Sequence, residues 1–352
     1  MSRYLIKSMQ SLEAYVPGEQ PRDMQYVKLN TNESPYPPSP AVIEAASREA
    51  ARLQLYSDPT CAAFRDAIAE RHGFARENVC ALNGSDDGLN MAFIAFAGRG
   101  GRAYFPDISY GCYKVFSDLH GVNYTMLPLR QDFTIDPSNY YHRDGMIVIA
   151  NPNAPTGIAL TRDEIEGILQ ANPDQVVLID EAYVDFGAES CLPLVRQYDN
   201  LLVMQTCSKS RSLAGARLGF AIGDAALIDD LERVRNSTNP YNVNRMTLAA
   251  GEAAILDDDY YMGNCRRIEA TRAQTAQRLN ALGFEVLPSQ ANFLFVRSDR
   301  IGGEALYLAL KQRGVLVRHF GAERICEYNR ITIGTPQQMD ILIENIKAII
   351  GA

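Results

Sequence analysis

The sequence predicts an α/β protein in which a large, mostly parallel sheet lies between helices and is followed by a smaller α+β region. Two observations predict this architecture. Short apolar runs, mostly β-branched or aromatic, alternate with helical patterns from about residue 85 to residue 222, and such alternation is typical of a parallel sheet with helices on both faces. From about residue 245 the pattern changes, because long helical segments are then separated by only a few short strand-like runs.

Each predicted strand is an apolar run of the kind that is buried on both faces of a sheet. The six runs are 102–105, 122–127, 146–150, 176–180, 201–206 and 217–222. Helical patterns lie at 85–97, 110–119 and 161–171. The last of these begins with Thr161 and Glu164, which have the spacing of a capping box. Ligands of such sheets bind at the carboxyl ends of the strands, so we expect the functional residues there.

The chain divides into three predicted parts. Residues 1–36 are rich in proline and polar residues, and we expect them to form an N-terminal arm that packs against another surface. Residues 37–245 form the predicted large domain. Residues 246–352 form a predicted smaller α+β domain, which ends in an amphipathic helix at 336–350.

The composition argues against several classes of protein. Of 352 residues, 47% are hydrophobic and 22% are charged, which excludes a disordered chain. With 34 Lys+Arg against 42 Asp+Glu, the formal net charge is −8, and no basic cluster is present that would bind nucleic acid. No apolar run approaches the ~20 residues of a membrane-spanning helix. The seven cysteines are scattered without a Cys-x-x-Cys pair, which disfavours disulfides and zinc and predicts a cytoplasmic protein.

Most short catalytic motifs are absent. The segment GRGGRA (98–103) matches the glycine spacing of a dinucleotide fingerprint, but it precedes a predicted strand, whereas the fingerprint follows one. There is no P-loop, no H-E-x-x-H and no G-x-S-x-G, and the four histidines do not cluster. Hydrolase, metalloenzyme and NAD-dependent functions are therefore disfavoured, and we expect no metal site.

Polar residues beside three predicted strands point to a lysine-bound cofactor. Asp180 ends the run VVLID, Lys209 follows LLVMQTCS, and Arg217 begins the next run. Taken alone, Asp180 is equally consistent with a helix N-cap, and Lys209 with a solvated loop lysine. However, the chain has only six lysines. Together these residues suit pyridoxal phosphate. The lysine amine can condense with its aldehyde, Ser208 and Arg217 can bind its phosphate, and the carboxylate can pair with its pyridine nitrogen.

Two further segments fit that cofactor. Asn83, Gly84 and Ser85 come directly before a helical pattern, where free N–H groups and the helix dipole can bind a phosphate. Tyr110 follows the strand RAYF and can stack on a pyridine ring. Each feature has an ordinary alternative, since such turns usually cap helices and such aromatic residues usually lie in the core. The functional interpretation depends on their occurrence at successive strand ends.

The segments that carry these residues resemble those of the fold-type I aminotransferases, and in particular the histidinol-phosphate aminotransferase family. The similarity extends over nearly the whole chain. In family order, the matching segments are LEAYVPGEQP (12–21), KLNTNESPYPPSP (28–40), YSDP (56–59), NGSDDG (83–88), NPNAPTG (151–157), DEAYVDF (180–186), TCSKSRSLAGARLGF (206–220) and RITIGT (330–335).

The resemblance implies a fold, an activity and an assembly. The fold is that of the fold-type I pyridoxal-phosphate transferases, with a mostly parallel seven-stranded sheet in the large domain and a smaller α+β domain at the C-terminus. The activity is transfer of the amino group of L-histidinol phosphate to 2-oxoglutarate, which gives imidazole-acetol phosphate and glutamate in histidine biosynthesis. The assembly is a homodimer with shared active sites.

The resemblance also implies a role for single residues. Those that act on the cofactor ring are Lys209 by a Schiff base, Asp180 at the pyridinium nitrogen, Tyr183 at the ring oxygen O3′, and Tyr110 by stacking. Those that bind the cofactor phosphate are Gly84, Ser85, Ser208, Arg217 and, from the neighbouring subunit, Tyr56. Those that bind the substrate anion are Arg330, Arg318 and Tyr15.

Two positions depart from the family pattern. The second asparagine of the family's N-N-P-T-G is replaced by Ala154, so either the neighbouring Asn153 substitutes for it at O3′ or Tyr183 acts there alone. In addition, Asp87 stands where the family has a glutamate.

Other functions on the same scaffold stay open at this point. An aromatic amino-acid aminotransferase or a threonine-phosphate decarboxylase would use nearly the same cofactor residues. A non-catalytic binding or regulatory protein is a third alternative, since a fold does not fix a function. It is disfavoured because the lysine is present and no basic domain is appended.

Overall fold

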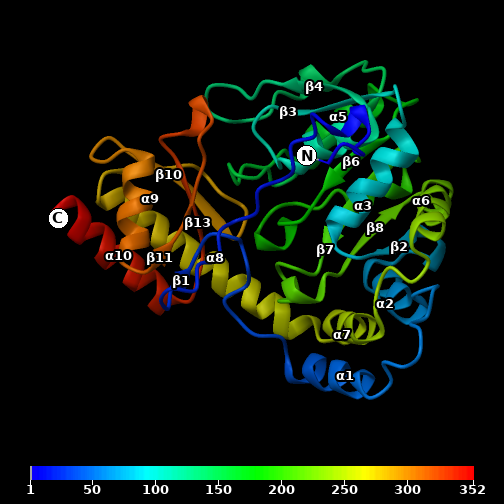
Figure 1. Ribbon diagram of the computed structural model, residues 1–352, viewed down its shortest axis with the longest axis horizontal. Coiled ribbons are helices and arrows are strands. Elements are labelled where there is room, and N and C mark those ends of the chain that lie inside the picture. Colours follow the sequence, from blue (N-terminus) through cyan, green and yellow to red (C-terminus); the bar gives the residue numbers. More distant parts are fainter. Residues whose placement is uncertain (1) are drawn as a thin grey trace.

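The computed structural model describes residues 2–352 and confirms the predicted fold class. A seven-stranded sheet of order β2-β8-β7-β6-β5-β3-β4 lies between helices (Figure 1). Its strands are β2 (Val79–Leu82), β3 (Arg102–Pro106), β4 (Asn123–Leu127), β5 (Met146–Ala150), β6 (Val177–Asp180), β7 (Leu201–Thr206) and β8 (Gly219–Gly223). Every neighbouring pair is parallel except those of β8, which runs antiparallel to β2 and β7.

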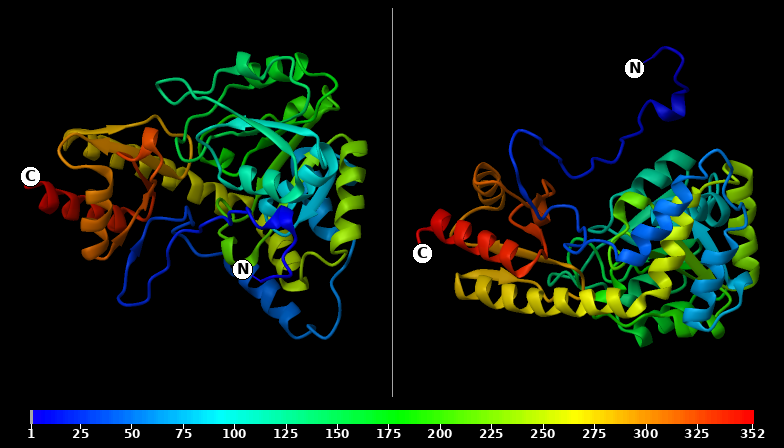
Figure 2. Two further views of the ribbon diagram at one scale, coloured as in Figure 1. Left: turned by 45° about the horizontal axis from the view of Figure 1, so that its top comes forward. Right: turned by 90° about the horizontal axis from the view of Figure 1, so that it is seen from below.

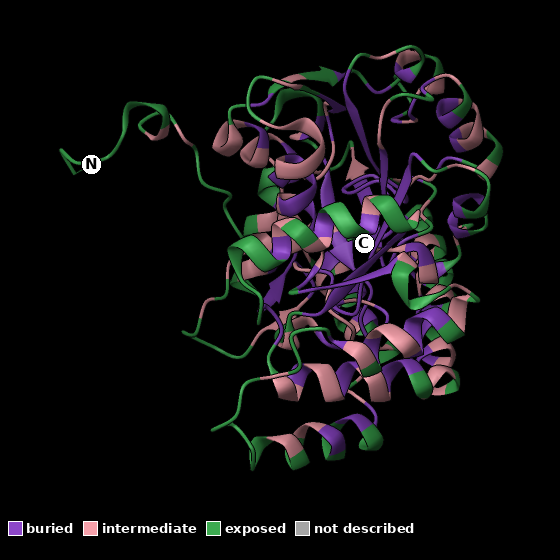
Figure 3. Cartoon of the chain, turned by 90° about the vertical axis from the view of Figure 1, so that its right-hand side faces the viewer, coloured by how far each residue is buried: buried purple, intermediate pink, exposed green. Residues whose placement is uncertain are grey.

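Side chains of this sheet alternate between two hydrophobic cores, as the pleat of a strand requires. In β5, Ile147 and Ile149 belong to the first core, whereas Met146 and Val148 belong to the second. Helices α2 (Ala62–His72), α5 (Arg162–Gln170) and α7 (Arg245–Leu256) contribute to the first core, together with single residues of two further helices. Helices α3 (Ser85–Ala92), α4 (Cys112–His120) and α6 (Ala225–Thr238) contribute to the second. Burial on both faces explains the apolar composition of the strands, which Figure 3 shows as the most buried part of the chain.

The six predicted strands all belong to this sheet. The observed strands differ from the predicted ones in length, and the sheet contains one strand that was not predicted. The four-residue strand β2 was not predicted, because a run as short as VCAL has no clear period. The helix predicted over 85–97 is α3 followed by a π-helical turn at Phe93–Ala97. The strand β8 begins at Gly219, so that Arg217 lies in the turn before it.

A second, antiparallel sheet follows along the chain, with the order β12-β13-β10-β9. Its strands are β9 (Phe284–Val286), β10 (Phe293–Ser298), β12 (Arg318–His319) and β13 (Asn329–Thr332). Helices α9 (Gly303–Gln312) and α10 (Pro336–Ile350) pack with it around a third core. The 24-residue helix α8 (Asp258–Ala281) extends from the large sheet to the small one (Figures 1 and 2).

The N-terminal part of the chain contacts both sheet regions. Strand β1 (Val27–Lys28) pairs in parallel with β11 (Val315–Leu316) beside the small sheet. The chain then reaches α1 (Pro40–Ala50), which packs against α7 beside the large sheet. The residues before β1 run along the surface and extend away from the helices at their start (Figure 3).

Three properties of the described chain bear on its chemistry. None of the helices in residues 2–352 has the length and apolar character needed to cross a membrane. All seven cysteines are free, and six of them are buried. Within the same residues, no three His, Cys, Asp or Glu side chains are grouped in a way that could hold a metal ion.

Candidate active site

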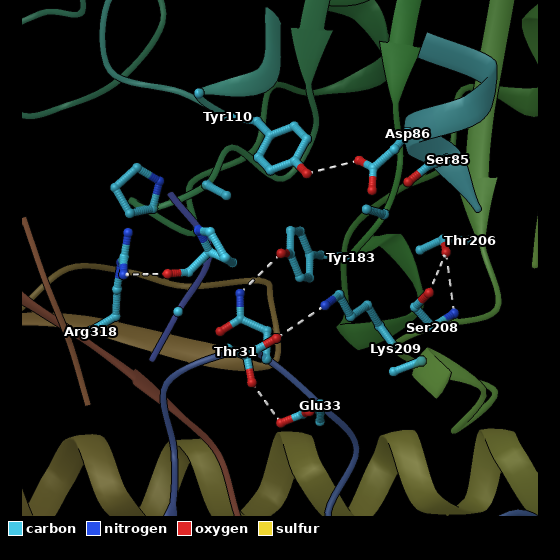
Figure 4. Close-up of a pocket in the computed structure, with 18 of the residues that line it drawn as sticks. Thr31, Glu33, Ser85, Asp86, Tyr110, Tyr183, Thr206, Ser208, Lys209 and Arg318 are labelled. Atoms are coloured by element: carbon cyan, nitrogen blue, oxygen red, sulfur yellow. Dashed lines mark hydrogen bonds between the residues drawn. The ribbon is translucent and has the colours of Figure 1, made fainter. Parts of the chain in front are cut away.

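Most of the predicted site residues line one cavity of about 760 Å³ at the carboxyl ends of the parallel strands. Its walls come from four parts of the chain: the start of α3, the loops after β3, β5, β6 and β7, the N-terminal segment before α1, and the small sheet. Figure 4 shows side chains from these parts pointing toward a common space. Residues singled out from the sequence thus lie close together at this edge of the sheet.

Lys209 enters the cavity from the loop that follows β7. Its Nζ donates to the carbonyl oxygen of Thr31 at 3.2 Å (Figure 4). Burial lowers the pKa of this amine to about 8, and the positive charge of Arg330 acts in the same direction. The position is therefore unlike that of a solvated lysine, because the neutral, nucleophilic form of the amine is favoured.

Asp180 ends β6, next to β7 in the sheet, and is 5% exposed. Its Oδ2 accepts a hydrogen bond from the hydroxyl of Tyr113 at 2.9 Å, and its Oδ1 accepts from the backbone N–H of Ala182 at 3.2 Å. Burial raises the pKa of the carboxyl to about 6, against the effect of these two donors. No α-helix begins here, since a turn and a short 3-10 segment follow, so the ordinary explanation as an N-cap does not apply.

The neighbouring Glu181 takes no part in the cavity. Its carboxylate accepts hydrogen bonds from the backbone N–H of Cys191 at 2.7 Å, the hydroxyl of Ser190 at 2.8 Å and the amide of Gln205 at 2.7 Å. The acidic pair at the end of β6 is thus divided: one carboxylate faces the cavity, and the other is fully bonded inside the protein.

Tyr183 follows β6 and faces the same cavity. Its hydroxyl oxygen accepts a hydrogen bond from the side-chain amide of Asn32 at 2.9 Å, and Asn32 in turn accepts from the hydroxyl of Thr332 at 3.0 Å. The tyrosine ring packs edge-on against Phe293. Because Asn32 uses the oxygen of the hydroxyl, the hydrogen atom of Tyr183 stays available for an acceptor in the cavity.

The start of α3 forms a pocket for an anion at one end of the cavity. Gly84 is the N-cap and has φ +83°, and a Cβ added to it would lie 2.7 Å from the guanidinium of Arg217. Ser85, Ser208 and Arg217 line the cavity beside it. The first N–H groups of a helix have no acceptor within the helix. Because the guanidinium of Arg217 lies close to these free donors, a phosphate could bind both.

Asp86 connects this pocket to Tyr110. One of its carboxylate oxygens accepts from Arg217 at 2.9 Å. The other accepts from the hydroxyl of Tyr110 at 2.8 Å, as Figure 4 shows. The ring of Tyr110 lies with its centroid 5.7 Å from that of Tyr15. Both rings line the cavity, which matches the predicted position of Tyr110.

Arg330 and Arg318 lie on the wall that the small sheet contributes. Within residues 2–352, neither has an acidic partner at ion-pair distance, and the buried Nε of Arg330 has no hydrogen-bond partner. One terminal nitrogen of Arg330 donates to the carbonyl of Asn30 at 3.0 Å, and Arg318 donates to the carbonyl of Val16 at 3.2 Å. A buried guanidinium without a carboxylate is unfavourable unless an anion binds it.

Asn153 and Tyr56, which were also predicted as site residues, do not line this cavity. Asn153 is held away from it, because its side chain donates to the carbonyl of Ile108 at 3.0 Å and accepts from Ser109 at 2.7 Å. Ala154 lines the cavity in its place. The structure thus does not bring Asn153 to the position of the missing family asparagine. Tyr56 is 79% exposed and stacks on Tyr241 with the ring centroids 4.5 Å apart.

Three side chains of the site were not identified from the sequence. Tyr113 contacts Asp180, Asn32 contacts Tyr183, and Asp86 links Arg217 to Tyr110. Asp86 could have been recognised, since it follows the predicted phosphate turn directly. Tyr113 and Asn32 carry no local signal, because an aromatic residue in a helix and an asparagine in a polar segment are ordinary.

The fold and this cavity define an aminotransferase. The chain belongs to the family described as aminotransferase class I and II, whose model matches residues 24–346. It is 49% identical to the histidinol-phosphate aminotransferase of Marinomonas sp. (strain MWYL1), over 99% of this chain and 100% of that protein. The histidinol-phosphate aminotransferase of Brachyspira hyodysenteriae is 48% identical, over 99% of each chain.

A solved structure supports the fold independently. The histidinol-phosphate aminotransferase from Sinorhizobium meliloti, in complex with pyridoxal-5'-phosphate, matches with a TM-score of 0.90 over 100% of this chain and 98% of that chain. The sequence identity is 23%, so the match is evidence for the shared fold alone.

Proposed function

We propose that this protein is a pyridoxal-phosphate-dependent aminotransferase that converts L-histidinol phosphate and 2-oxoglutarate into imidazole-acetol phosphate and glutamate. The observation that carries the proposal is that Lys209 and Asp180 follow adjacent strands and share one cavity with the unpaired guanidinium of Arg330. The choice of substrate is supported by full-length identities of 49% and 48% to proteins named for that reaction.

The residues of the cavity fit pyridoxal phosphate. Gly84, Ser85, Ser208 and Arg217 would hold the phosphate, since only a residue without Cβ leaves room beside Arg217. Tyr110 would stack on the ring. When bound, the cofactor withdraws electrons from the α-carbon of the amino substrate.

Lys209 has two tasks in this proposal. It attaches the cofactor, and after an amino substrate has displaced it, its Nζ takes the proton from the substrate's α-carbon. With a pKa of about 8, roughly a tenth of the amines are neutral at pH 7, about 300 times more than at an ordinary lysine pKa. The carbonyl of Thr31, 3.2 Å from Nζ, orients the amine.

Asp180 and Tyr183 would contact the cofactor ring at two positions, the ring nitrogen and the oxygen O3′. The carboxylate of Asp180 keeps the ring nitrogen protonated. The hydroxyl of Tyr183 would donate to the ring oxygen O3′ without help from a second side chain at this position, because Ala154 has no polar group and Asn153 is hydrogen-bonded elsewhere. Asn32 fixes the hydroxyl oxygen and so directs its hydrogen into the cavity.

Arg330 would bind both substrates in turn. A guanidinium fork matches a carboxylate and a phosphate equally well, so one residue can hold the α-carboxylate of glutamate and the phosphate of histidinol phosphate. Arg318 and Tyr15 lie on the same side of the cavity and would add a second cation and a hydroxyl for the phosphate.

We also propose that the protein is a cytoplasmic homodimer. Tyr56 is exposed and does not line the cavity of its own chain, which supports a contact with the cofactor phosphate of a second copy. The free cysteines support a reducing compartment.

The division into an arm, a large domain and a small domain is retained with one adjustment. Helix α7 begins at Arg245, the predicted boundary, but Ala250 and Ala254 of this helix belong to the first core of the large sheet. We therefore propose that the small domain begins within α8, whose later residues Ile268 and Leu279 belong to the third core.

The proposed substrate can be tested by spectral half-reactions. The protein loaded with pyridoxal phosphate is mixed with histidinol phosphate, phenylalanine, tyrosine, threonine phosphate or glutamate, and kcat/KM is compared for each. We expect histidinol phosphate and glutamate to convert the cofactor most efficiently. Carbon dioxide release from threonine phosphate would indicate a decarboxylase, and a preference for phenylalanine an aromatic aminotransferase. A protein that acquires no visible absorbance with the cofactor would refute the enzymatic proposal.

A further inference from the structure

We propose that Tyr113 is a positioning residue for Asp180: its hydroxyl keeps the carboxylate ionised and fixes the direction of its oxygens beneath the cofactor ring. This inference rests on the proposed function in one respect, since Asp180 is taken to face the ring nitrogen. The contact between Tyr113 and Asp180 does not depend on any ligand.

The geometry of Tyr113 leaves its hydroxyl one partner. The side chain is fully buried in the second core, and the hydroxyl donates to Oδ2 of Asp180 at 2.9 Å. The ring is held by two aromatic neighbours, edge-on by Tyr110 at 5.7 Å and tilted by Phe105 at 5.8 Å between centroids. A buried hydroxyl without a hydrogen-bond partner is unfavourable. In the described chain, the carboxylate of Asp180 is the partner of the Tyr113 hydroxyl.

The electrostatic surroundings of Asp180 oppose its ionisation. Burial is the largest cause of the raised pKa, and the negative charges of Asp86 and Glu181 add to it. The donors that lower this pKa are the hydroxyl of Tyr113 and the N–H of Ala182. Two further titratable groups that sense this charge are Cys112 of α4 and Tyr183. Tyr113 is thus the one side chain among these that stabilises the carboxylate by a hydrogen bond.

An ionised carboxylate is what the proposed chemistry needs at this position. A protonated Asp180 would offer the ring nitrogen a donor, and the nitrogen would then stay neutral. Each oxygen of Asp180 accepts one hydrogen bond from the protein, and a carboxylate oxygen can accept a second. The protein therefore fixes the carboxylate while leaving acceptor capacity for the ring.

The test compares three variants of the full chain loaded with pyridoxal phosphate labelled with nitrogen-15 in its ring. Tyr113→Phe removes the hydroxyl and keeps the ring. Tyr261→Phe is the matched control, because Tyr261 is also fully buried, its hydroxyl accepts from the N–H of Ser39 at 3.0 Å, and it does not line the cavity. Asp180→Asn is the reference for a lost carboxylate. The nitrogen-15 chemical shift reports whether the ring nitrogen carries a proton.

We expect the ring nitrogen of the wild type and of Tyr261→Phe to be protonated. In Tyr113→Phe the carboxylate is more basic and draws the proton toward itself, so the resonance moves toward that of neutral pyridine, in the direction shown by Asp180→Asn. A side chain that only fills space would not produce this displacement, because phenylalanine fills the same space.

A second measurement needs no cofactor. The free energy of unfolding is followed between pH 4 and pH 8, with Asp180→Asn as the background. The folded pKa of about 6 exceeds the ordinary value near 4, so the contribution of Asp180 is present at low pH and is lost as the pH rises through the folded pKa. In Tyr113→Phe we expect the upper end of this loss, which lies at the folded pKa, to rise by about one pH unit, with no rise in Tyr261→Phe.

The outcomes separate this inference from the proposed function. If the wild type binds no pyridoxal phosphate, the proposed function fails. The pH profile of the free energy of unfolding then still tests whether Tyr113 lowers the pKa of Asp180. If Tyr113→Phe and Tyr261→Phe behave alike in both measurements, the inference is wrong whatever the activity. A displaced upper end of the pH-dependent loss with an unchanged nitrogen-15 shift would support the effect of Tyr113 on Asp180 and overturn its extension to the ring.

Discussion

Among single residues, Lys209 determines whether the cofactor is bound covalently. None of the other five lysines lines the cavity, so no other amine can replace it. In Lys209→Ala we expect the visible absorbance of the covalently bound cofactor to be absent and the cofactor to be removed by gel filtration. Mass spectrometry after borohydride reduction measures the attachment. Lys347→Ala, at an exposed ion pair with Glu344, should retain it, and a retained band in Lys209→Ala would refute the assignment.

Arg330 influences Lys209 through charge as well as binding substrate. Because its guanidinium helps to lower the pKa of the amine, removing the charge in Arg330→Gln should raise that pKa. The rate of covalent cofactor uptake rises with pH as the amine deprotonates, near pH 8 in the wild type. We expect this rise to move to higher pH in Arg330→Gln.

The matched control for that shift is Arg318→Gln. It also removes a cavity arginine, but its charge is not among the principal influences on Lys209. Both proteins take up the same free cofactor, so a difference in the pH profile reports the lysine and not the ligand. Equal profiles for the two variants would show that Arg330 acts on substrates only.

Residues that directly follow a buried strand could be predicted from the sequence, and residues that meet across the fold could not. Asp180 ends one apolar run and Lys209 follows the next, and this order fixes which edge of the sheet they occupy. Tyr113 is 67 residues from its partner, and Asn32 is 151 residues from its partner. No local pattern encodes such contacts, because they arise only when helices and loops pack on the completed sheet.

At the scale of elements, the start of α3 combines backbone shape with ligand binding. Gly84 has a positive φ, and its missing Cβ leaves room for Arg217. Gly84→Ala should therefore weaken cofactor binding, since overpacking typically costs about 1–3 kcal/mol, which corresponds to roughly a fivefold to 150-fold loss of affinity. Equilibrium titration with pyridoxal phosphate measures the effect.

Gly100→Ala is the control for backbone strain. Gly100 also has a positive φ, of +81°, but an added Cβ would meet nothing within 4 Å. We expect both variants to lose about 1–2 kcal/mol of stability from the left-handed backbone and only Gly84→Ala to lose affinity. Equal affinities in the two variants would contradict the role of this turn in holding the phosphate.

The direction of β8 explains how one side chain reaches the site. In a fully parallel sheet, a residue before a strand lies at the edge opposite to the carboxyl ends. Because β8 runs antiparallel to β7, its beginning lies at the edge where β7 ends, and Arg217 lines the same cavity as Ser208 there. The sequence indicated a mostly parallel sheet but not which strand is reversed, since an apolar run has the same composition in either direction.

Across the whole molecule, the cavity is divided between parts of the chain with different tasks. The large sheet and its loops supply the residues proposed for the cofactor, whereas Tyr15, Arg318 and Arg330 come from the N-terminal segment and the small sheet. The two sides are joined by contacts such as that between Asn32 and Thr332, 300 residues apart. The sequence predicted both regions but not their junction, which depends on how α8 and the N-terminal segment cross between the sheets.

The proposed homodimer predicts that two inactive variants can restore each other. A Lys209→Ala subunit lacks its own amine but still carries Tyr56, and a Tyr56→Ala subunit keeps its amine but offers its partner no tyrosine. When the two are unfolded together and refolded, mixed dimers hold one site with Lys209 from one subunit and Tyr56 from the other. Statistical mixing makes about half of the dimers mixed, with one complete site in two, so about a quarter of the wild-type activity should return.

A second mixture of variants is the control for this experiment. Lys209→Ala refolded with Lys209→Ala/Tyr56→Ala contains no lysine in any site and should stay inactive at every ratio. Because Tyr56 is exposed and stacks only on Tyr241 within the described chain, its loss should leave the stability of the single subunit within about 0.5 kcal/mol of the wild type. Activity in the first mixture that never exceeds that of Tyr56→Ala alone would mean that Tyr56 completes no site in a partner subunit.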